Sequence, residues 1–493
     1  MTDDASTLTD PTARDRAHRH QAPETLALAV VWSADQPELL GELLMPTPTW
    51  SLFGRGAGVA FDPHPRLQLM RARPGLSEPG PPLSNPRLSR SQLRLRLLDG
   101  EGVAFERIGR APLFHGARGE AVDRGHLRPG ETLQIGNQLL LVAVRRRAWL
   151  PAPGDGAPVL DDFPFGAPDP LGLVGESPAL WALRERILFA ARRPEHVLIT
   201  GASGTGKEMV AVALHRLGSR RPLVARNAAT FPDALIDAEL FGNARNYPNM
   251  GMPARPGLIG EADGSMLFLD ELGELPAGLH AHLLRVLDAG EYQRLGESQV
   301  RHSHFRLVAA TNRPPSVLKD DLRARLPLRI EVPGLGERRE DIPLLARHLL
   351  DKLLASDEIP APAALDSGRP RVSLALAAAL VRHDYTTHLR ELHALLLEAL
   401  ARRSGPDLEW APAARPAGTP GTNVQSDNPV RVPAATNRLD IDPAKLQAAL
   451  DEHKGSLERA RRALGLSSRH ALARLVTRHG LRAGNHWRPA PKS

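Results

Sequence analysis

The sequence predicts a multidomain protein, with an all-β sandwich, an α/β domain and a small all-α domain. Three observations lead to this fold class. Residues 26–144 hold short apolar runs between Gly/Pro turns, and residues 171–403 alternate strand-like with helix-like runs. Residues 446–481 have helical spacing of apolar side chains, interrupted by glycines. The 493 residues are enough for roughly three domains of about 150 residues each.

The composition excludes several classes of chemistry. The chain has no cysteine, which rules out disulfides, thiolate zinc sites and cysteine nucleophiles. Aromatic residues are only 4% of the total, so large aromatic-lined cavities are not expected. The N-terminal residues are polar, without a signal-peptide core, and no apolar run approaches about 18 residues. We therefore expect a cytoplasmic protein with no membrane partner.

The positive charge is concentrated at the C-terminal end. The net charge is +7, and residues 438–493 alone hold twelve Lys/Arg and five Asp/Glu. The remaining chain is therefore neutral overall. A basic segment on a neutral body indicates contact with nucleic acid, while a solvated charged helix face is the plain alternative.

Composition breaks set the expected domain boundaries. Stretches rich in Pro, Gly and Ala precede and follow the central block, as is typical of linkers. We expect a disordered N-terminus (1–24), a β-sandwich (25–146), a linker (147–170), a central block (171–403), a second linker (404–437) and a basic domain (438–493).

Alternation marks the strands of the first domain. Leu93, Leu95 and Leu97 alternate with Arg94 and Arg96, which is the period of two expected of a half-buried strand. The apolar runs at 26–32, 102–109 and 131–144 are similarly short and bounded by turn residues. Such a series favours an all-β sandwich.

A glycine loop follows a short apolar run at 196–200 and precedes a helix-like run at 208–218. This is the context of a phosphate-binding loop, because glycines let backbone N–H groups approach phosphates and a lysine reaches the terminal phosphates. Glu208 stands where the strict pattern has Ser or Thr. The predicted ATP-binding residues of this loop are Gly201, Gly204, Thr205, Gly206, Lys207 and Glu208.

Two acids end the hydrophobic run 266–269 and complete such a site. Asp270 is predicted to hold Mg²⁺, and Glu271 to polarise the attacking water. The structural alternative is a pair of acids at the start of a helix. The presence of the glycine loop favours the interpretation that Asp270 and Glu271 belong to a catalytic site.

The central block resembles a known family. The strings GASGTGKE, NAATFPDALIDAELFG, GEADGSMLFLDELGELP, LLRVLDAGEYQRLG, RLVAATNR and LGERREDIPLLARHLL resemble the AAA+ domain of sigma-54-dependent transcriptional activators, over residues 171–403. Within this block, the resemblance implies an α/β subdomain (171–335) followed by a helical lid (336–403). The resemblance implies ATP hydrolysis in a self-assembled ring, usually a hexamer. Each active site would be completed by the neighbouring subunit.

The resemblance also implies roles for further residues. Asn227 matches the switch asparagine that pairs with the catalytic glutamate when nucleotide is absent. Thr311 and Asn312 match the sensor of the γ-phosphate, and Arg390 the lid arginine that contacts nucleotide. Arg325 matches one of two arginine fingers acting in trans. Lys319 occupies the other finger position, where it keeps the charge but lacks the planar fork.

Two segments depart from the family pattern. The family carries GAFTGA, which contacts sigma-54, where this chain has NARNYPNMG at 243–251. Pro248 fixes a φ angle and removes an N–H where the family has a threonine. The residues before the lid arginine, HDYTTH at 383–388, replace the family's usual Trp-Pro-Gly-Asn run. Coupling to polymerase therefore does not follow from the ATPase motifs.

The β domain resembles the forkhead-associated (FHA) pattern, in the FGRG run at 53–56 and the LSRSQ run at 88–92. The resemblance implies a phosphothreonine-binding sandwich, with Arg55, Ser89 and Arg90 as donors to the phosphate. Gln92 replaces the usual structural histidine, and Arg110-Ala111 replaces Asn-Gly. A sandwich used only for packing or partner contact is the alternative.

The basic segment at 446–481 resembles the Fis-type helix-turn-helix that ends many such activators, with Ser467 as a cap of the recognition helix. A generic charged helical hairpin is the alternative. The predicted DNA-binding residues are Arg469, His470 and Arg474 in the major groove, and Arg461, Arg462 and Arg478 at phosphates.

Three functions remain open on this evidence. The first is a DNA-binding regulator whose ring hydrolyses ATP to remodel sigma-54 RNA polymerase, in a signalling arrangement like that of two-component systems. The second is a regulator of the same descent that does not engage sigma-54, because the GAFTGA loop is replaced. The third is a phosphoprotein adaptor whose ATPase acts as an assembly switch.

Overall fold

A computed structural model describes residues 24–56, 64–98, 102–116, 120–153, 159–218, 221–232, 235–276, 278–355, 370–402, 405 and 407–409. The expected N-terminal segment up to residue 23 lies outside these residues. The expected DNA-binding segment 438–493 also lies outside them, so the predictions for Arg461, Arg462, Arg469, His470, Arg474 and Arg478 stay predictions.

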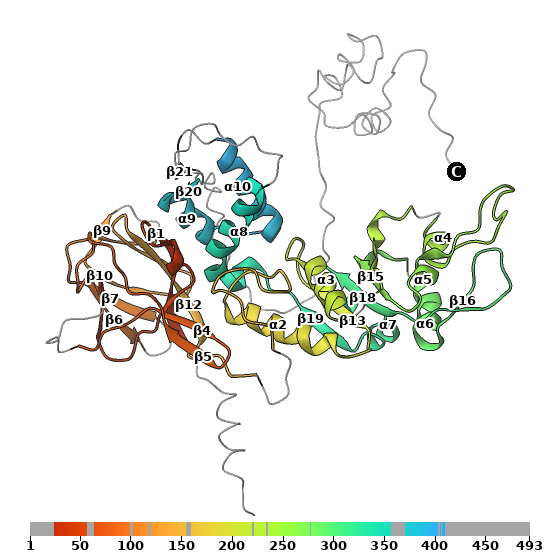
Figure 1. Cartoon of the computed structure of the whole chain (residues 1–493), viewed down its shortest axis with the longest axis horizontal. Helices are drawn as coiled ribbons and strands as arrows, with labels where there is room; N and C mark the ends of the chain where they lie inside the picture. The colour runs from red at the N-terminus through yellow and green to blue at the C-terminus, as the bar shows by residue number, and fades with distance from the viewer. Residues whose placement is uncertain are drawn as a thin grey trace, which may run out of the picture. The chain divides into compact units, whose positions relative to one another are not determined.

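The first domain is a β-sandwich, as its alternating runs predict (Figure 1). One sheet has the order β5-β4-β2-β1-β12-β11-β8-β9 and the other β10-β7-β6-β3. The larger sheet comprises β1 (Glu24–Ser33), β2 (Leu43–Leu44), β4 (Met70–Arg73), β5 (Leu76–Pro79), β8 (Leu113–His115), β9 (Ala121–Val122), β11 (Thr132–Ile135) and β12 (Leu139–Arg147), with a 3₁₀ turn η1 at Pro37–Leu39. The smaller sheet comprises β3 (Ser51–Phe53), β6 (Leu93–Leu98), β7 (Gly102–Arg107) and β10 (Arg124–Leu127).

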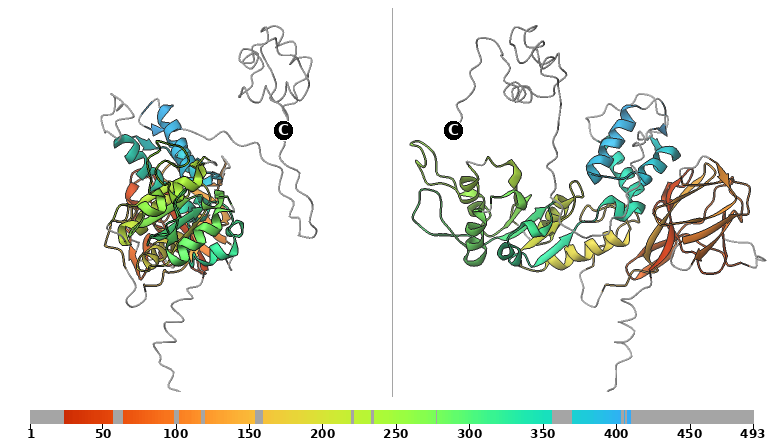
Figure 2. Two further views of the ribbon diagram at one scale, coloured as in Figure 1. Left: turned by 90° about the vertical axis from the view of Figure 1, so that its right-hand side faces the viewer. Right: turned by 180° about the vertical axis from the view of Figure 1, so that it is seen from behind.

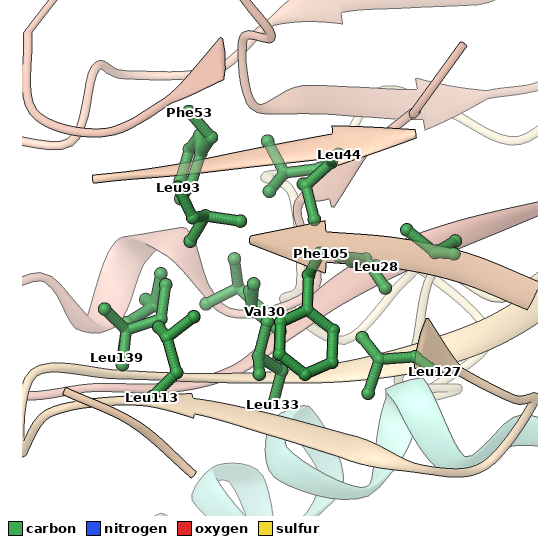
Figure 3. Packing of buried hydrophobic residues seen from close by; sticks show 14 of the residues in the cluster. Leu28, Val30, Leu44, Phe53, Leu93, Phe105, Leu113, Leu127, Leu133 and Leu139 are labelled. Carbon is green, nitrogen blue, oxygen red and sulfur yellow. The ribbon is translucent and has the colours of Figure 1, made fainter. Parts of the chain in front are cut away.

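Aliphatic side chains from both sheets fill the space between them (Figure 3). Leu93 and Leu95 of β6 are fully buried, whereas Arg94 and Arg96 lie on the outer face. Phe105 of β7 lies among leucines of the opposite sheet. The period of two thus places alternate residues in one core.

Strand β1 is buried on both faces. Leu26, Leu28 and Val30 enter the sandwich core. The alternate residues Ala27, Ala29 and Val31 belong to a second cluster with Ala377, Ala378 and Val381 of the lid helix α9 (Leu374–Arg382). Small alanines on this outer face let the helix approach the sheet closely. The unbroken apolar run of β1 therefore reflects contact with two layers.

Hydrogen bonds also join the sandwich to the lid. The indole Nε1 of Trp32 donates to the Val372 carbonyl at 2.7 Å. Arg382 Nη1 donates to the Gly116 carbonyl at 2.7 Å. The sandwich and the lid therefore share a buried apolar interface edged by directional polar contacts.

The second domain is a five-stranded parallel sheet with the order β14-β15-β18-β13-β19, covered by helices on both faces (Figure 1). Its strands are β13 (Val197–Thr200), β14 (Val224–Asn227), β15 (Met266–Asp270), β18 (Arg306–Thr311) and β19 (Leu328–Glu331). Its helices are α2 (Pro178–Ala191), α3 (Lys207–Gly218), α4 (Ile236–Phe241), α5 (Gly257–Glu261), α6 (Leu279–Ala289) and α7 (Asp320–Ala324). Short 3₁₀ turns are η2 (Ala228–Thr230), η3 (Leu272–Glu274), η4 (Pro315–Val317) and η5 (Leu335–Asp341), and β16 (Glu291–Tyr292) pairs with β17 (Arg301–His302).

The lid contains α8 (Ile342–Ala355), α9 and α10 (His388–Ala401), drawn in teal and blue in Figure 2. Strand β20 (Arg371–Val372) pairs in parallel with β21 (Asp407–Leu408). Leu408 is fully buried in the lid core, so these residues belong to the lid. The predicted second linker begins at 404, so its described residues 407–408 pack with the lid. Within the described part of the chain, every helix is too short or too polar to span a bilayer.

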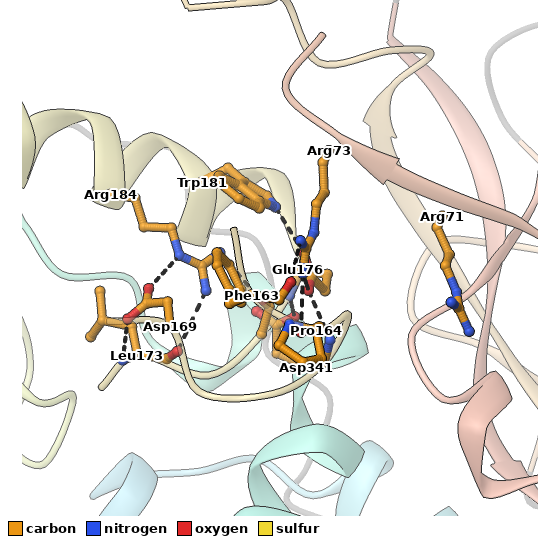
Figure 4. Close-up of polar contacts among 12 residues, drawn as sticks. Arg71, Arg73, Phe163, Pro164, Asp169, Leu173, Glu176, Trp181, Arg184 and Asp341 are labelled. Carbon is orange, nitrogen blue, oxygen red and sulfur yellow. Dashed lines mark hydrogen bonds and ion pairs between the residues drawn. The ribbon is translucent and has the colours of Figure 1, made fainter. Parts of the chain in front are cut away.

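Between the sandwich and α2, the described residues 148–153 and 159–177 form no helix or strand, and several of them are tightly packed. Asp169 pairs with Arg184 of α2 at 2.7 Å, and both side chains are fully buried (Figure 4). Arg73 of β4 pairs with Glu176 at 2.6 Å and lies over the rings of Phe163 and Trp181. These contacts fix the sandwich to the start of the α/β domain.

Candidate nucleotide site

The glycine loop joins the end of β13 to the start of α3, as the sequence predicts. Lys207 Nζ donates to the carbonyls of Gly201 and Ala202, at 3.0 and 3.2 Å. Burial lowers the pKa of Lys207, and the negative charges of Glu271 and Asp270 oppose this shift. The lysine and the acid pair therefore share one electrostatic environment at the carboxyl edge of the sheet, where open parallel sheets bind ligands.

The lid closes directly onto the loop. The backbone N–H of Leu389 donates to the Gly204 carbonyl at 3.0 Å. Arg390 Nη1 lies 3.1 Å from Ser203 Oγ. Gly204 has φ +76°, and a Cβ there would lie 2.1 Å from the Thr387 carbonyl oxygen. Only glycine fits this close approach. The structure thus places the predicted lid arginine beside the phosphate loop.

Strand register brings Asn227 to the acid pair. Asn227 and Asp270 are direct partners at the ends of the parallel strands β14 and β15. Asn227 Nδ2 donates to Asp270 Oδ2 at 3.3 Å, and its Oδ1 accepts from Ala229 N–H. We expected pairing with the glutamate, and this expectation is corrected, because the register places the amide opposite Asp270.

Glu271 points to the sensor strand instead. Its backbone has φ +52°, in the left-handed region that non-glycine residues rarely adopt. Its Oε2 accepts from the Asn312 backbone N–H at 3.2 Å. Thr311 is buried and ends β18, with its Oγ1 accepting from Arg313 N–H. The predicted sensor residues therefore lie next to the predicted catalytic glutamate.

The residues present fit a magnesium ion shared with a nucleotide. Within the described ranges, no group of three or more His, Cys, Asp or Glu is arranged to hold a metal. Mg²⁺ bound with ATP commonly uses one or two carboxylates, the phosphates and several waters. Asp270 presents such a carboxylate, held by Asn227 and by the Glu271 N–H.

A pocket beside the loop was not predicted. Its walls are mainly apolar and come from both the α/β domain and the lid. Four of the lining positions, Gly172 to Val174 and Leu180, lie in or near the segment before α2, where no local pattern indicates a pocket. The lining residues are Gly172, Leu173, Val174, Leu180, Leu183, Thr205, Gly206, Met209, Val210, Val332, Arg338, Leu345, His348, Leu349, Lys352 and Leu389.

Three residues of η5 connect this pocket with its surroundings. Arg338 Nη2 lies 3.4 Å from the Thr205 carbonyl of the phosphate loop. Glu340 lies 3.5 Å from Arg146 of the sandwich strand β12, with both side chains buried. Asp341 accepts from Ser177 Oγ at 2.6 Å at the start of α2. One short segment therefore contacts the loop, the sandwich and the first helix.

Burial dominates the titration of Glu340. It raises the pKa of Glu340 to about 7, with Arg146 lowering it and Asp341 raising it further. The pair with Arg146 is buried but poorly aligned, since Arg146 Nη2 has no hydrogen-bond partner. Such a pair adds little net stability.

The segment that replaces Trp-Pro-Gly-Asn folds around Glu391 of α10. Burial alone would raise the pKa of Glu391, but hydrogen bonds from His383, Thr387 and Thr386 outweigh it and lower the pKa to about 2. The Tyr385 hydroxyl donates to the Leu380 carbonyl. The altered segment still places Arg390 at the loop, because these bonds define the start of α10.

The loop that replaces GAFTGA is organised by Asn243. Its buried amide Nδ2 donates to the carbonyls of Ala244, Tyr247 and Pro253, between 2.9 and 3.3 Å. The Tyr247–Pro248 bond is cis, and the Tyr247 ring packs against Gly296 of the neighbouring loop. Met250 at the tip is 87% exposed. The loop thus presents an ordered apolar tip.

Arg325 lies at the end of α7 and pairs with Asp288 of α6 in the same chain. Lys319, at the other finger position, precedes α7. Burial, together with the charge of Lys319, lowers the pKa of His280 on α6. Arg325 therefore contacts α6 directly, and the charge of Lys319 acts on His280 of the same helix.

The predicted phosphate-binding residues of the sandwich come together. The Arg55 N–H donates to the Ser89 carbonyl, and Arg55 Nε to the Leu88 carbonyl. Ser89 Oγ accepts from Arg110 N–H. Gly54 is required here, because a Cβ would lie 2.4 Å from the Arg90 carbonyl oxygen. Arg90 itself is exposed on the same turn.

Two residues support this turn. Gln92 is fully buried, accepts from Ser89 N–H and donates to the Ala111 carbonyl. Gln92 therefore connects the turn at Ser89 with the turn at Ala111. It stands at the position where the FHA pattern has histidine. Arg66 Nη2 lies 2.8–2.9 Å from the carbonyls of Gly54, Arg55 and Gly56. Sequence reasoning missed Arg66, since no local pattern marks it.

The fold is an α/β domain with a glycine loop between β13 and α3 and a helical lid beside that loop. Residues 173–335 match the family model of the Sigma-54 interaction domain. The chain is 34% identical over 322 residues to the transcriptional regulatory protein ZraR of Escherichia coli, covering 62% of this chain and 68% of that protein. It is 44% identical over 190 residues to the Nif-specific regulatory protein of Bradyrhizobium diazoefficiens, covering 37% of this chain and 33% of that protein. The chain belongs to the family of sigma-54-dependent transcriptional regulators.

Among solved structures, NtrX from Brucella abortus in complex with ADP is similar, at 28% identity and a TM-score of 0.44. The match covers 64% of this chain and 70% of that chain. The chain thus spans a third of the Nif-specific regulator and about two thirds of ZraR and NtrX.

Proposed function

We propose that this protein is an ATP-dependent, DNA-binding transcriptional regulator whose AAA+ domain hydrolyses ATP in a ring to remodel sigma-54 RNA polymerase. One observation carries the proposal. Four separate segments bring together Lys207, the adjacent acids Asp270 and Glu271, Asn312 and Arg390 at one edge of the parallel sheet. This arrangement is the one that binding and cleaving a triphosphate requires.

The loop and the lid bind the substrate. The backbone N–H groups at the start of α3 and the positive end of that helix face the phosphates. Lys207 exchanges its bonds to Gly201 and Ala202 for phosphate oxygens. The apolar pocket between the α/β domain and the lid binds the adenine base. Arg390 contacts the phosphates from the lid.

Hydrolysis needs an oriented water and stabilised charge. Glu271 orients and polarises the water for in-line attack on the γ-phosphate, and the neighbouring Asn312 N–H fixes its carboxylate. Asp270 would hold Mg²⁺, which when bound would neutralise part of the phosphate charge. Arg325 of the neighbouring protomer reaches the γ-phosphate, so the site is complete only in the ring.

A second candidate has its own supporting observation. Asn243 fixes the loop at 243–255 in a shape with Tyr247 and Met250 at its tip, where the family carries GAFTGA. A regulator with this loop would hydrolyse ATP and bind DNA without engaging sigma-54.

The β-sandwich is proposed to bind phosphothreonine in a partner protein. The turn of Arg55, Ser89 and Arg90, held by Gln92, supports this role, because it presents charged donors on a rigid scaffold. A phosphothreonine peptide should bind the wild type and bind Arg55→Ala much more weakly. Equal binding by both would remove this part of the proposal.

One assay separates the two candidates. Purified protein, ATP and sigma-54 polymerase are combined on a promoter with an upstream binding site, and open complexes are measured. The proposal expects open complexes that require Lys207 and residues 438–493. ATP turnover without open complexes favours the second candidate. DNA affinity that does not fall as the salt concentration rises would contradict DNA binding by the basic segment at 438–493.

A further inference from the structure

The Arg325 side chain is held by a carboxylate of its own chain. Arg325 Nη2 donates to Asp288 Oδ2 at 3.1 Å, and Arg325 Nε pairs with Asp288 Oδ1. This is a side-on bidentate contact, which fixes the plane of the guanidinium. It uses Nε and one hydrogen of Nη2, and leaves three N–H groups at the end of the guanidinium outside the pair.

Helix stability does not explain the position of Asp288. It is the next-to-last residue of α6, which ends at Gly290 in the left-handed conformation. A negative charge in the last turn of a helix interacts unfavourably with the helix dipole. An exposed ion pair also adds little to folding stability, and both side chains here are about half exposed. Holding the Arg325 side chain therefore explains the Asp288 carboxylate better than stabilising α6 does.

Resting on the proposed function, we propose that Asp288 is a positioning residue that orients Arg325 toward the triphosphate of the neighbouring protomer. Asp288 holds the side edge of the guanidinium, so that the three remaining N–H groups at its other end are available to the γ-phosphate. A flexible arginine would lose this orientation, since ordering its side chain opposes binding. Asp288 thus acts in trans, through Arg325, and never touches the nucleotide of its own protomer.

The first test is steady-state ATP turnover by full-length variants. Asp288→Asn should lower kcat at least about tenfold, because an arginine finger contributes far more than that to phosphoryl transfer. Its KM for ATP should stay within about twofold of the wild-type value. The reason is that ATP in the ground state is bound by the protomer that receives the finger, not by the protomer that carries Asp288. Asp288→Glu should recover part of the activity. Asp320→Asn, which removes the neighbouring exposed pair with Arg323, is the matched control and should keep wild-type turnover.

The second test mixes variants in one ring. Glu271→Gln loses its own site but keeps its finger, and Asp288→Asn keeps its own site. Random reassembly of equal amounts should restore about a quarter of wild-type turnover, because a quarter of the interfaces combine both intact parts. A mixture of Asp288→Asn with Arg325→Ala should stay inactive, because both substitutions impair the finger that a subunit supplies to its neighbour.

The outcomes separate the two proposals. If Asp288→Asn turns over ATP like the wild type, or if its mixture with Glu271→Gln stays inactive while Arg325→Ala with Glu271→Gln recovers, the role of Asp288 is wrong and the trans finger stands. If Arg325→Ala keeps full activity, or does not recover with Glu271→Gln, the trans arrangement and the role of Asp288 both fail. Gel filtration of each variant verifies folding and assembly.

Discussion

Asn227 donates its side-chain amide to Asp270 across the adjacent ends of β14 and β15, at 3.3 Å. The pair follows from strand register, because the two residues are direct partners in the parallel sheet. Glu271, one residue later, turns away through a left-handed backbone to the Asn312 N–H. Neighbouring acids thereby have different environments: one carboxylate is tied to an amide, the other to the sensor strand.

Replacing Asn227 should weaken Mg²⁺ binding at the proposed site on Asp270. In Asn227→Ala, Asp270 loses the donor that orients it. Such supporting contacts commonly contribute about 10–100-fold to metal affinity or activity. We expect ATP turnover to need more Mg²⁺ and to fall accordingly. Titrating Mg²⁺ at saturating ATP measures this. An unchanged Mg²⁺ dependence would show that the contact has no such role.

Gly204→Ala should separate the lid from the phosphate loop. The new Cβ would meet the Thr387 carbonyl, in addition to the strain of φ +76°. Gly130→Ala is the matched control, with φ +85° and open space around the Cβ. Calorimetry should find nucleotide binding lost in Gly204→Ala and retained in Gly130→Ala. Equal binding by the two variants would rule out the close approach.

Glu340 should make stability depend on pH. Its pKa is raised from 4.5 to about 7 by burial, so its contribution is complete below pH 4.5 and is lost as pH rises through about 7. Glu340→Gln stays neutral, so between pH 5 and 8 its free energy of unfolding should fall less than that of the wild type, by about 1–3 kcal/mol. Denaturant melts across this range measure the difference. Parallel curves would contradict the raised pKa.

The buried Asp169–Arg184 pair should matter far more than an exposed one. Asp169→Ala leaves Arg184 buried without its partner, which typically costs about 3–5 kcal/mol. Asp407→Ala removes a comparable but exposed contact with Arg371 and should cost about 0–1 kcal/mol. Thermal or urea unfolding gives both values. Similar losses in the two variants would refute the difference in burial.

Local patterns predicted much of the fold and the places of several candidate site residues in it. The alternation in β6 and the run of β1 gave the correct strands, and the sequence around the glycine loop gave the correct strand, turn and helix. The acid pair was also correctly placed at the end of a buried strand. These features depend on near neighbours in the chain, so periodicity and residue type are enough to find them.

Contacts between distant segments were not predictable in the same way. The outward alanines of β1 gave no sign that they pack on α9, and Arg66 stands in no motif. The partner of Asn227 depends on the register of two strands separated by a long stretch of chain. Strands as short as β9 carry too few residues to form a pattern.

The most direct test of the central claim compares ATP binding and turnover in Glu271→Gln. If a triphosphate is held by the loop at 201–207 and attacked by a water that Glu271 orients, the variant should bind ATP like the wild type and hydrolyse it at least about a hundredfold more slowly. Wild-type turnover by Glu271→Gln would contradict the account.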